Sequence, residues 1–126
     1  MKKKLLICGA SGFIGRNMAE HFAARGEFEV YGTYANSAPP QVPGVRMIRA
    51  DLTDRAQVTA AVTDKDVIVQ AAATTSGARD IVTRPYHHVT DNAVMNSLLF
   101  RAAHEQEVGH VVFFSCTVMY PSSERP

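Results

Sequence analysis

The sequence predicts an α/β fold, in which helices cover both faces of a doubly wound parallel sheet. Short runs of strand-forming residues alternate along the chain with stretches of helical apolar spacing. Strands are expected at residues 4–8, 28–34, 45–49, 66–71 and 110–115, and helices at 13–25, 55–62 and 91–107. Such alternation is typical of βαβ units, whose parallel strands are buried on both sides.

Residues at the predicted helix ends support these boundaries. Arg25 and Gly26 supply a cation and a C-cap glycine where the first helix should stop. Thr53 or Asp54 can cap the second helix, and Thr90 or Asp91 the third. The helix positions therefore rest on capping residues as well as on apolar spacing.

Two connections depart from the regular alternation. The proline-rich residues 37–44 cannot hold a helix, so an irregular loop should join the second and third strands. Residues 74–90, which include His87 and His88, lack periodicity and are expected to form a long loop. Loops of that length in compact domains are often functional.

Composition limits the class of protein. The 126 residues carry a net charge of +1, with 46% apolar and 20% charged residues, as expected for one soluble globular domain. The balanced charge argues against nucleic-acid binding, and the only basic run, Lys2–Lys4, leads into a short strand. No apolar stretch reaches the ~18 residues of a membrane span. We expect a cytoplasmic protein.

The two cysteines, Cys8 and Cys116, are each predicted at the end of a buried strand. Neither has a second cysteine or a histidine at metal-ligand spacing. The sequence therefore predicts neither a disulfide framework nor a zinc site.

Three glycines follow the first predicted strand. Gly9, Gly12 and Gly15 are spaced three apart, between the apolar run Leu5–Cys8 and the first helix. In a Rossmann-type fold such glycines permit a tight turn, close approach to a pyrophosphate and close packing of helix on strand. The free N–H groups of the helix start would supply the anion site. Taken alone, a glycine triplet is a weak signal, and the alternative is a simple glycine-rich turn.

Further signals fall at the carboxyl ends of later strands, where open α/β sheets bind ligands. Asp51 and Leu52 follow the third strand, the small residues Ala71–Ala73 follow the fourth, and Ser115–Pro121 follows the fifth. Asn92 is expected to open the helix before the fifth strand. Each has a structural alternative: Asp51 as a helix cap, the alanines as close packing, and Asn92 as a helix-start residue.

The order and spacing of these signals resemble the extended short-chain dehydrogenase/reductases of the NAD-dependent epimerase/dehydratase family, which act mostly on nucleotide sugars. The alanine run, the Asn92–Met95 helix start and the Met119–Pro121 ending are most similar to the GDP-fucose synthase-like members. The resemblance implies an oxidoreductase or isomerase with an NAD or NADP cofactor, a nucleotide-sugar substrate and a possible homodimer through residues 91–107.

By that resemblance, the cofactor-binding residues would come from five segments. The glycines would hold the pyrophosphate, Asp51 and Leu52 the adenine, and Ala71–Ala73 the ribose and nicotinamide side. The full expected set is Gly9, Ser11, Gly12, Phe13, Ile14, Gly15, Tyr34, Asn36, Asp51, Leu52, Ala71, Ala72, Ala73 and Asn92.

The end of the second strand departs from the NAD-preferring members of that family. The position where they carry an acidic residue is Tyr34, followed by Ala35 and Asn36. A 2′-phosphate would not be repelled there, and Arg46 or Arg49 could reach it, so NADP is slightly favoured over NAD.

The catalytic residues depart further. The family's catalytic Ser or Thr, four residues before Tyr120, is replaced by Cys116, with Ser115 and Thr117 as substitutes if the strand end shifts. The alternative is a buried structural thiol. The cysteine that fucose synthases use in epimerisation aligns with Val118.

No tyrosine of the chain is followed four residues later by the lysine that these enzymes use to lower its pKa. That pair would lie beyond Pro126. We therefore expect residues 1–126 to be an incomplete N-terminal NAD(P)-binding domain, with the substrate-binding part missing and no activity alone. The alternative is a non-catalytic NAD(P)-sensing module of the same fold.

Overall fold

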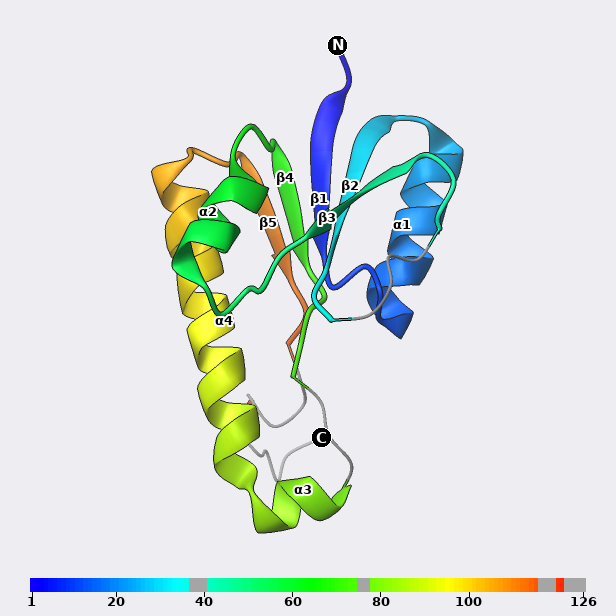
Figure 1. Cartoon of the computed structure of the whole chain (residues 1–126). Helices are drawn as coiled ribbons and strands as arrows, with labels where there is room; N and C mark the ends of the chain where they lie inside the picture. The colour runs from blue at the N-terminus through cyan, green and yellow to red at the C-terminus, as the bar shows by residue number, and fades with distance from the viewer. Residues whose placement is uncertain (37–40, 75–77, 116–119, 122–126) are drawn as a thin grey trace.

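The computed structural model describes residues 1–36, 41–74, 78–115 and 120–121. All five predicted strands are present and form one parallel sheet in the order β3-β2-β1-β4-β5 (Figure 1). Their bounds are β1 (Lys3–Cys8), β2 (Phe28–Tyr34), β3 (Val45–Arg49), β4 (Val67–Gln70) and β5 (His110–Phe113). This is the strand order of a Rossmann-type fold, so the predicted fold class is confirmed.

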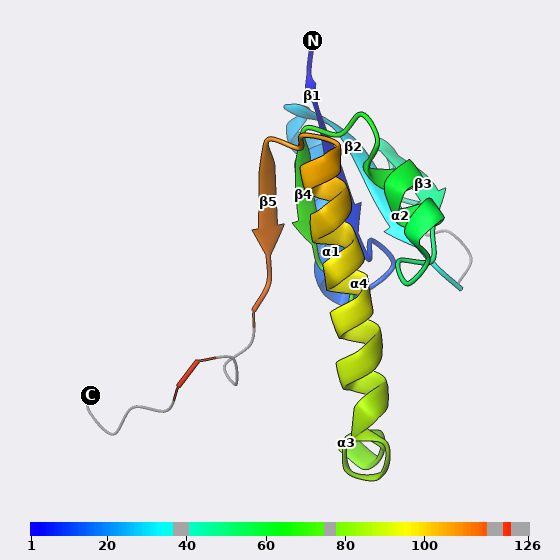
Figure 2. The same cartoon turned by 90° about the vertical axis from the view of Figure 1, so that its left-hand side faces the viewer.

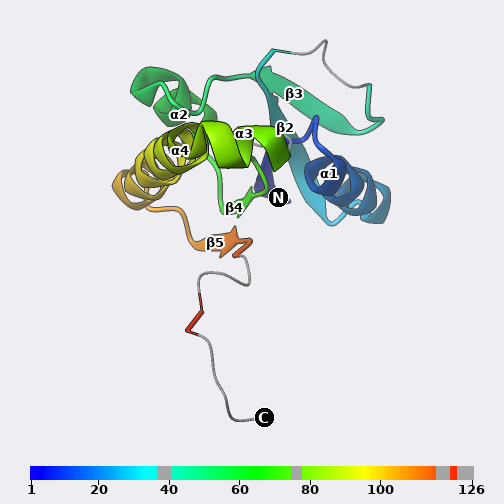
Figure 3. The ribbon, with the colours of Figure 1, turned by 90° about the horizontal axis from the view of Figure 1, so that it is seen from below.

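Within the described residues four helices accompany the strands, namely α1 (Phe13–Arg25), α2 (Arg55–Val62), α3 (Ala78–Thr83) and α4 (Pro85–Glu105). Figure 3 shows α1 on one face of the sheet, with α2 and α4 together on the other. Although α4 has 21 residues, the described part of the chain contains no helix that is long and apolar enough to cross a membrane.

The core lies in two layers because successive side chains of a strand point to opposite faces. In β1, Leu5 and Ile7 pack toward α1, whereas Leu6 and Cys8 pack toward α2 and α4. All four are at most 1% exposed. This double burial explains why β1 is a continuous apolar run rather than an alternating one.

The order of the strands also positions a ligand site. The chain leaves β1 toward β2 on one side and returns to pair β4 on the other. Ligands of open α/β sheets bind at such a reversal, outside the carboxyl ends of the strands. The loops after β1 and β4 meet there.

The predicted ends of the first two helices are confirmed. Gly26 adopts the left-handed conformation with φ 67°, and its N–H lies within hydrogen-bonding distance of the Phe22 and Ala23 carbonyls. Asp54 caps α2 by accepting a hydrogen bond from the N–H of Gln57 at 2.9 Å.

The connection between β2 and β3 contains no helix in its described residues, 35–36 and 41–44. Residues 37–40 of the predicted irregular loop lie outside the described part of the chain.

The prediction of a long loop at residues 74–90 was wrong. Residues 78–83 form α3, and α4 begins at Pro85, so His87 and His88 are helical and neither Thr90 nor Asp91 caps a helix. Figures 1 and 2 show α3 and the first turns of α4 extending past the ends of the strands. Tyr86 and Val89 are 60% and 69% exposed. Because this stretch buries no continuous face, it lacks the apolar spacing that marks a helix in a sequence.

Candidate functional site

The loop from β1 into α1 is tied to the neighbouring strand. Gly9 has a φ of 75°, a left-handed conformation that favours glycine. Its N–H donates to Oγ1 of Thr33 at 3.0 Å, and the N–H of Ala10 donates to the Thr33 carbonyl at 2.8 Å. Thr33 is a buried polar residue of β2. The loop is therefore held in one position against β2.

The three glycines of the loop are required for different reasons. A Cβ at Gly9 would lie 2.6 Å from Cα of Ala72, and one at Gly15 would lie 2.1 Å from the Gly9 carbonyl oxygen. At Gly12, by contrast, the nearest atom would be the Gly9 oxygen at 3.4 Å. Packing within the chain therefore requires glycine at the first and third positions, whereas at Gly12 it leaves room for a side chain.

The first turn of α1 offers free donors. Gly12 is its N-cap residue and provides no side-chain cap. The first helical hydrogen bond runs from the N–H of Arg16 to the Gly12 carbonyl. The preceding N–H groups, of residues 13–15, thus have no acceptor within the helix. Together with the positive end of the helix dipole, they favour an anion such as a phosphate.

A cavity of about 740 Å³ opens in front of this helix start. Its volume is within the range of small-molecule and cofactor sites, about 300–1,000 Å³. Its lining comes from the ends of the first four strands, the α1 loop and α4. The lining residues are Gly9, Ser11, Gly12, Phe13, Ile14, Thr33, Tyr34, Ala35, Asn36, Ala50, Asp51, Leu52, Thr53, Ala71, Ala72, Ala73, Thr74, Asp91 and Met95.

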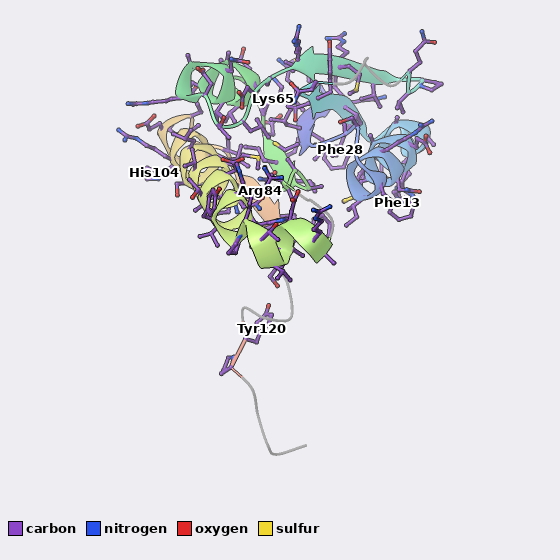
Figure 4. The ribbon with its side chains drawn as sticks, turned by 60° about the horizontal axis from the view of Figure 1, so that its bottom comes forward. Phe13, Phe28, Lys65, Arg84, His104 and Tyr120 are labelled. Atoms are coloured by element: carbon purple, nitrogen blue, oxygen red, sulfur yellow. The ribbon has the colours of Figure 1, made fainter. Side chains whose placement is uncertain are left out.

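Twelve of the fourteen residues expected to bind a cofactor line this cavity, all but Gly15 and Asn92. Gly15 lies beneath the loop, where it packs on Gly9. Phe13, labelled in Figure 4, begins α1 and is 86% exposed. The structure therefore brings together the segments that the sequence placed at separate strand ends.

Of the wall that α4 contributes to the site, the sequence indicated only Asn92. Asp91 and Met95 line the cavity one helical turn apart. The spacing of Met95 and Leu99 on a predicted helix face was the available signal. It could not show which turn faces the cavity, because that depends on where α4 crosses the sheet.

Asp51 lies in the cavity wall and does not cap α2, which Asp54 does. Its Oδ1 accepts hydrogen bonds from the Thr53 hydroxyl at 2.6 Å and the Thr53 N–H at 2.9 Å. These two bonds, the hydroxyl first, lower the pKa of Asp51 below its usual range. The carboxylate is therefore charged at neutral pH and held in a fixed orientation.

A chain of side-chain amides supports the segment after β4. Gln70, only 2% exposed, accepts from the N–H of Ala72 at 3.1 Å and donates from Nε2 to Oδ1 of Asn96 at 2.8 Å. One turn earlier on α4, Asn92 accepts from the N–H of Thr74 at 2.9 Å and donates to its carbonyl at 3.1 Å. These bonds fix the cavity wall to α4.

The expectation that Asn92 opens a helix was wrong, because α4 begins seven residues earlier, at Pro85. Asn92 lies inside the helix, where its Nδ2 also donates to the carbonyl of His88 at 2.7 Å. Its side chain thus links the helix to the residues that follow β4.

Replacing Gln70 with leucine should lower the free energy of unfolding by about 1–3 kcal/mol. The change leaves the N–H of Ala72 and Oδ1 of Asn96 without their Gln70 partner in a part-buried site. Urea unfolding followed by circular dichroism measures the loss. The control is Asn17→Ala, which removes an exposed bond to the Phe13 carbonyl and should change stability by less than about 0.5 kcal/mol. Equal effects of the two substitutions would contradict a supporting role for Gln70.

Cys8 lies at the end of β1, as predicted, and is fully buried. Burial raises the pKa of its thiol to about 12, despite an opposing hydrogen bond with Thr33. The thiol is therefore protonated at neutral pH and is a packing group rather than a nucleophile. The described residues contain no cluster of three or more potential metal ligands.

Of the three residues expected to take part in catalysis, the structure describes only Ser115, two residues after the end of β5 at Phe113. Ser115 is exposed, and its Oγ is 2.9 Å from the hydroxyl oxygen of Tyr120. Figure 4 shows Tyr120 apart from the sheet and helices. Cys116 and Thr117 lie outside the described residues.

The chain is similar in sequence to known proteins of one family. Residues 5–126 match the model of the NAD dependent epimerase/dehydratase family. The chain is 31% identical over 122 residues to a GDP-L-fucose synthase of Azorhizobium caulinodans, covering 95% of this chain and 35% of that protein. It is 33% identical over 132 residues to a dTDP-glucose 4,6-dehydratase of Streptomyces antibioticus, covering 95% of this chain and 39% of that protein. The chain thus spans little more than a third of these relatives.

Solved structures of other enzymes share the fold of this chain. The enzyme WbmH of Bordetella bronchiseptica, in complex with NAD+, superposes with a TM-score of 0.80 at 26% identity, covering 100% of this chain and 43% of that one. Uronate dehydrogenase of Agrobacterium tumefaciens, a Y136A mutant complexed with NAD, gives 0.71 at 27% identity, covering 91% and 41%. By fold, glycine loop and sequence match, the chain belongs to the NAD-dependent epimerase/dehydratase family.

Proposed function

We propose that this chain is the cofactor-binding part of an NAD(P)-dependent enzyme that epimerises, dehydrates or reduces a nucleotide sugar. The observation that carries the proposal is the cavity at the sheet's reversal point, which faces the uncapped start of α1. The nucleotide-sugar substrate is supported by the two curated relatives, whose names describe a GDP-sugar and a dTDP-sugar enzyme.

The residues present fit a dinucleotide. The open space at Gly12 and the free N–H groups of the first turn of α1 suit a pyrophosphate that must lie close to the backbone. Asp51 and Leu52 would contact the adenine, and Ala71–Ala73 the ribose and nicotinamide. Once bound, the nicotinamide would accept or donate a hydride at a sugar carbon.

The chain's own part in the chemistry would fall to the end of β5. Ser115 or Thr117 would donate a hydrogen bond to the reacting sugar oxygen, whereas Cys116 is a weaker donor. Proton transfer in this family depends on a tyrosine with a lysine four residues later. Residues 1–126 contain no such pair, so we expect them to bind the cofactor without turning over substrate.

Calorimetric titration of the purified protein with NADH and NADPH tests the binding function. We expect saturable binding of at least one of them, with one site per chain. Binding of neither would overturn the proposal. A parallel assay with nucleotide sugars should show no turnover by residues 1–126, and turnover would contradict the assignment of proton transfer to a pair outside them.

A second candidate function is a non-catalytic sensor of NAD(P) with the same fold. The observation that favours it is the cysteine at position 116, where the catalytic hydroxyl is expected. The two functions differ in chemistry rather than in binding. A Tyr-x-x-x-Lys sequence within about forty residues beyond Pro126 of the natural protein would support the enzyme, and its absence the sensor.

A further inference from the structure

We propose that α3 and the first turns of α4 form the surface on which the rest of the natural protein, the chain that follows Pro126, docks. We call residues 78–90 the α3–α4 hairpin. The inference rests on the proposed function, in which residues 1–126 are one part of a larger enzyme, and it specifies where the two parts meet.

The α3–α4 hairpin has no buried face. None of the residues 78–90 is buried, and only Asp80 and His88 are partly covered. α3 has six residues, whereas isolated helices shorter than about 12 residues are marginal in water. The ion pair between Arg84 and Asp80, at 2.8 Å, is accessible to solvent and adds little stability. The hairpin therefore buries no apolar surface that would hold it in place.

Large apolar side chains are nevertheless concentrated on the hairpin. Ile81 and Val82 of α3 are 56% and 81% exposed, and Tyr86 and Val89 at the start of α4 are exposed to a similar degree. Single exposed apolar residues are ordinary on a protein surface, but several on one small element indicate an interaction site. The hairpin thus presents an apolar surface suited to a protein partner.

The base of the hairpin is fixed at the rim of the cofactor cavity. Thr74 and Asp91, on either side of the hairpin in the sequence, both line the cavity. Asn92 connects its two ends by accepting from the N–H of Thr74 at 2.9 Å and donating to its carbonyl at 3.1 Å. From this base the hairpin extends past the carboxyl ends of the strands (Figures 1 and 2). A partner bound to it would lie beside the cavity, where a sugar-binding part is needed.

The chain that follows β5 starts from the same edge of the sheet. Because β5 runs parallel to β4, its carboxyl end lies at the edge from which the hairpin extends. The chain covers 35% and 39% of its two curated relatives, so more than half of each relative lies outside the match. A segment of that size could cover the hairpin. These observations favour the continuing chain as the partner over a second copy of residues 1–126.

Hydrogen exchange measured by mass spectrometry on residues 1–126 and on the full-length natural protein tests this inference. We expect the amides of residues 78–90 to exchange at least about tenfold more slowly in the full-length protein, because docking adds burial to a segment that has none. α2 is the internal control, since its apolar face is already buried in residues 1–126. Equal exchange of the hairpin in the two proteins would overturn the inference.

Two variants of the full-length protein separate docking from a local effect on the helices. Val82→Ser combined with Val89→Ser should return the hairpin to the exchange rate seen in residues 1–126, although valine and serine have similar helix propensities. Arg79→Ser changes an exposed charged residue of the same hairpin and should leave the protection in place. None of these three residues lines the cavity, so cofactor binding should not change. Full protection in the double variant would contradict docking through the apolar side chains.

Light scattering distinguishes a second copy from the continuing chain. We expect residues 1–126 to be monomeric, and a dimer that the double variant dissociates would overturn the inference. A natural protein that ends near Pro126 would overturn it as well. Cofactor binding without protection of the hairpin would overturn this inference alone. Protection of the hairpin in a protein that binds neither NADH nor NADPH would instead overturn the proposed function and support docking.

Discussion

Replacing Gly15 with alanine is expected to destabilise the protein by about 3 kcal/mol or more. The new Cβ would lie 2.1 Å from the carbonyl oxygen of Gly9 and 2.7 Å from its carbonyl carbon. Both are backbone atoms of a loop anchored to Thr33, so they cannot move aside like the end of a flexible side chain. Either α1 must shift from the sheet or the loop must lose its bonds to β2.

The direction of the expected stability change distinguishes close packing from helix propensity. In an unconstrained helix, alanine is favoured over glycine by about 1 kcal/mol, so helix propensity alone predicts stabilisation. Gly109→Ala is the matched control, because a Cβ there would lie at an ordinary 3.5 Å from the carbonyl oxygen of Asp66. Urea midpoints measured by circular dichroism compare the variants. A Gly15→Ala protein as stable as the wild type would show that helix and loop are not packed this closely.

Much of the fold was predictable because apolar spacing and helix-end residues indicate the same elements. The expected bounds of α1 and α2 match the structure, since each helix combines a buried apolar face with a clear end signal. Gly26 terminates α1, and Asp54 caps the start of α2. The central strands were predictable from their continuous burial. Prediction failed where burial was missing, in α3 and the first turns of α4, which lie beyond the sheet.

The candidate site was predictable to the extent that it depends on chain connectivity. The glycine loop and the strand ends follow from the βαβ order, which brings the carboxyl ends of parallel strands together. The α4 wall does not follow from it. The bond between Gln70 and Asn96 joins residues 26 apart, and nothing local in either segment indicates the other. Such contacts depend on how a helix is rotated and where it crosses the sheet, and local sequence patterns do not indicate either.

Gly12→Ala should separate the binding role of the loop from its structural role. Gly12 has φ −83° and ψ 171°, an extended conformation open to any residue, and the added Cβ would lie 3.4 Å from the nearest atom. Alanine is a poorer N-cap than glycine, so we expect a stability loss of at most about 1 kcal/mol. The affinity for NADH and NADPH should fall about a hundredfold or more, or about 2.8 kcal/mol, because the methyl group occupies the space through which a pyrophosphate reaches the backbone.

The Gly12→Ala protein must be measured for both folding stability and cofactor binding. Ser11→Ala, at the neighbouring lining position, removes only a hydroxyl and should weaken binding a few-fold at most, about 1 kcal/mol. A folded Gly12→Ala protein that binds NADH as tightly as the wild type would exclude a pyrophosphate at the start of α1. Loss of binding with the fold retained would instead mean that the second glycine serves the ligand, whereas the first and third serve the chain itself.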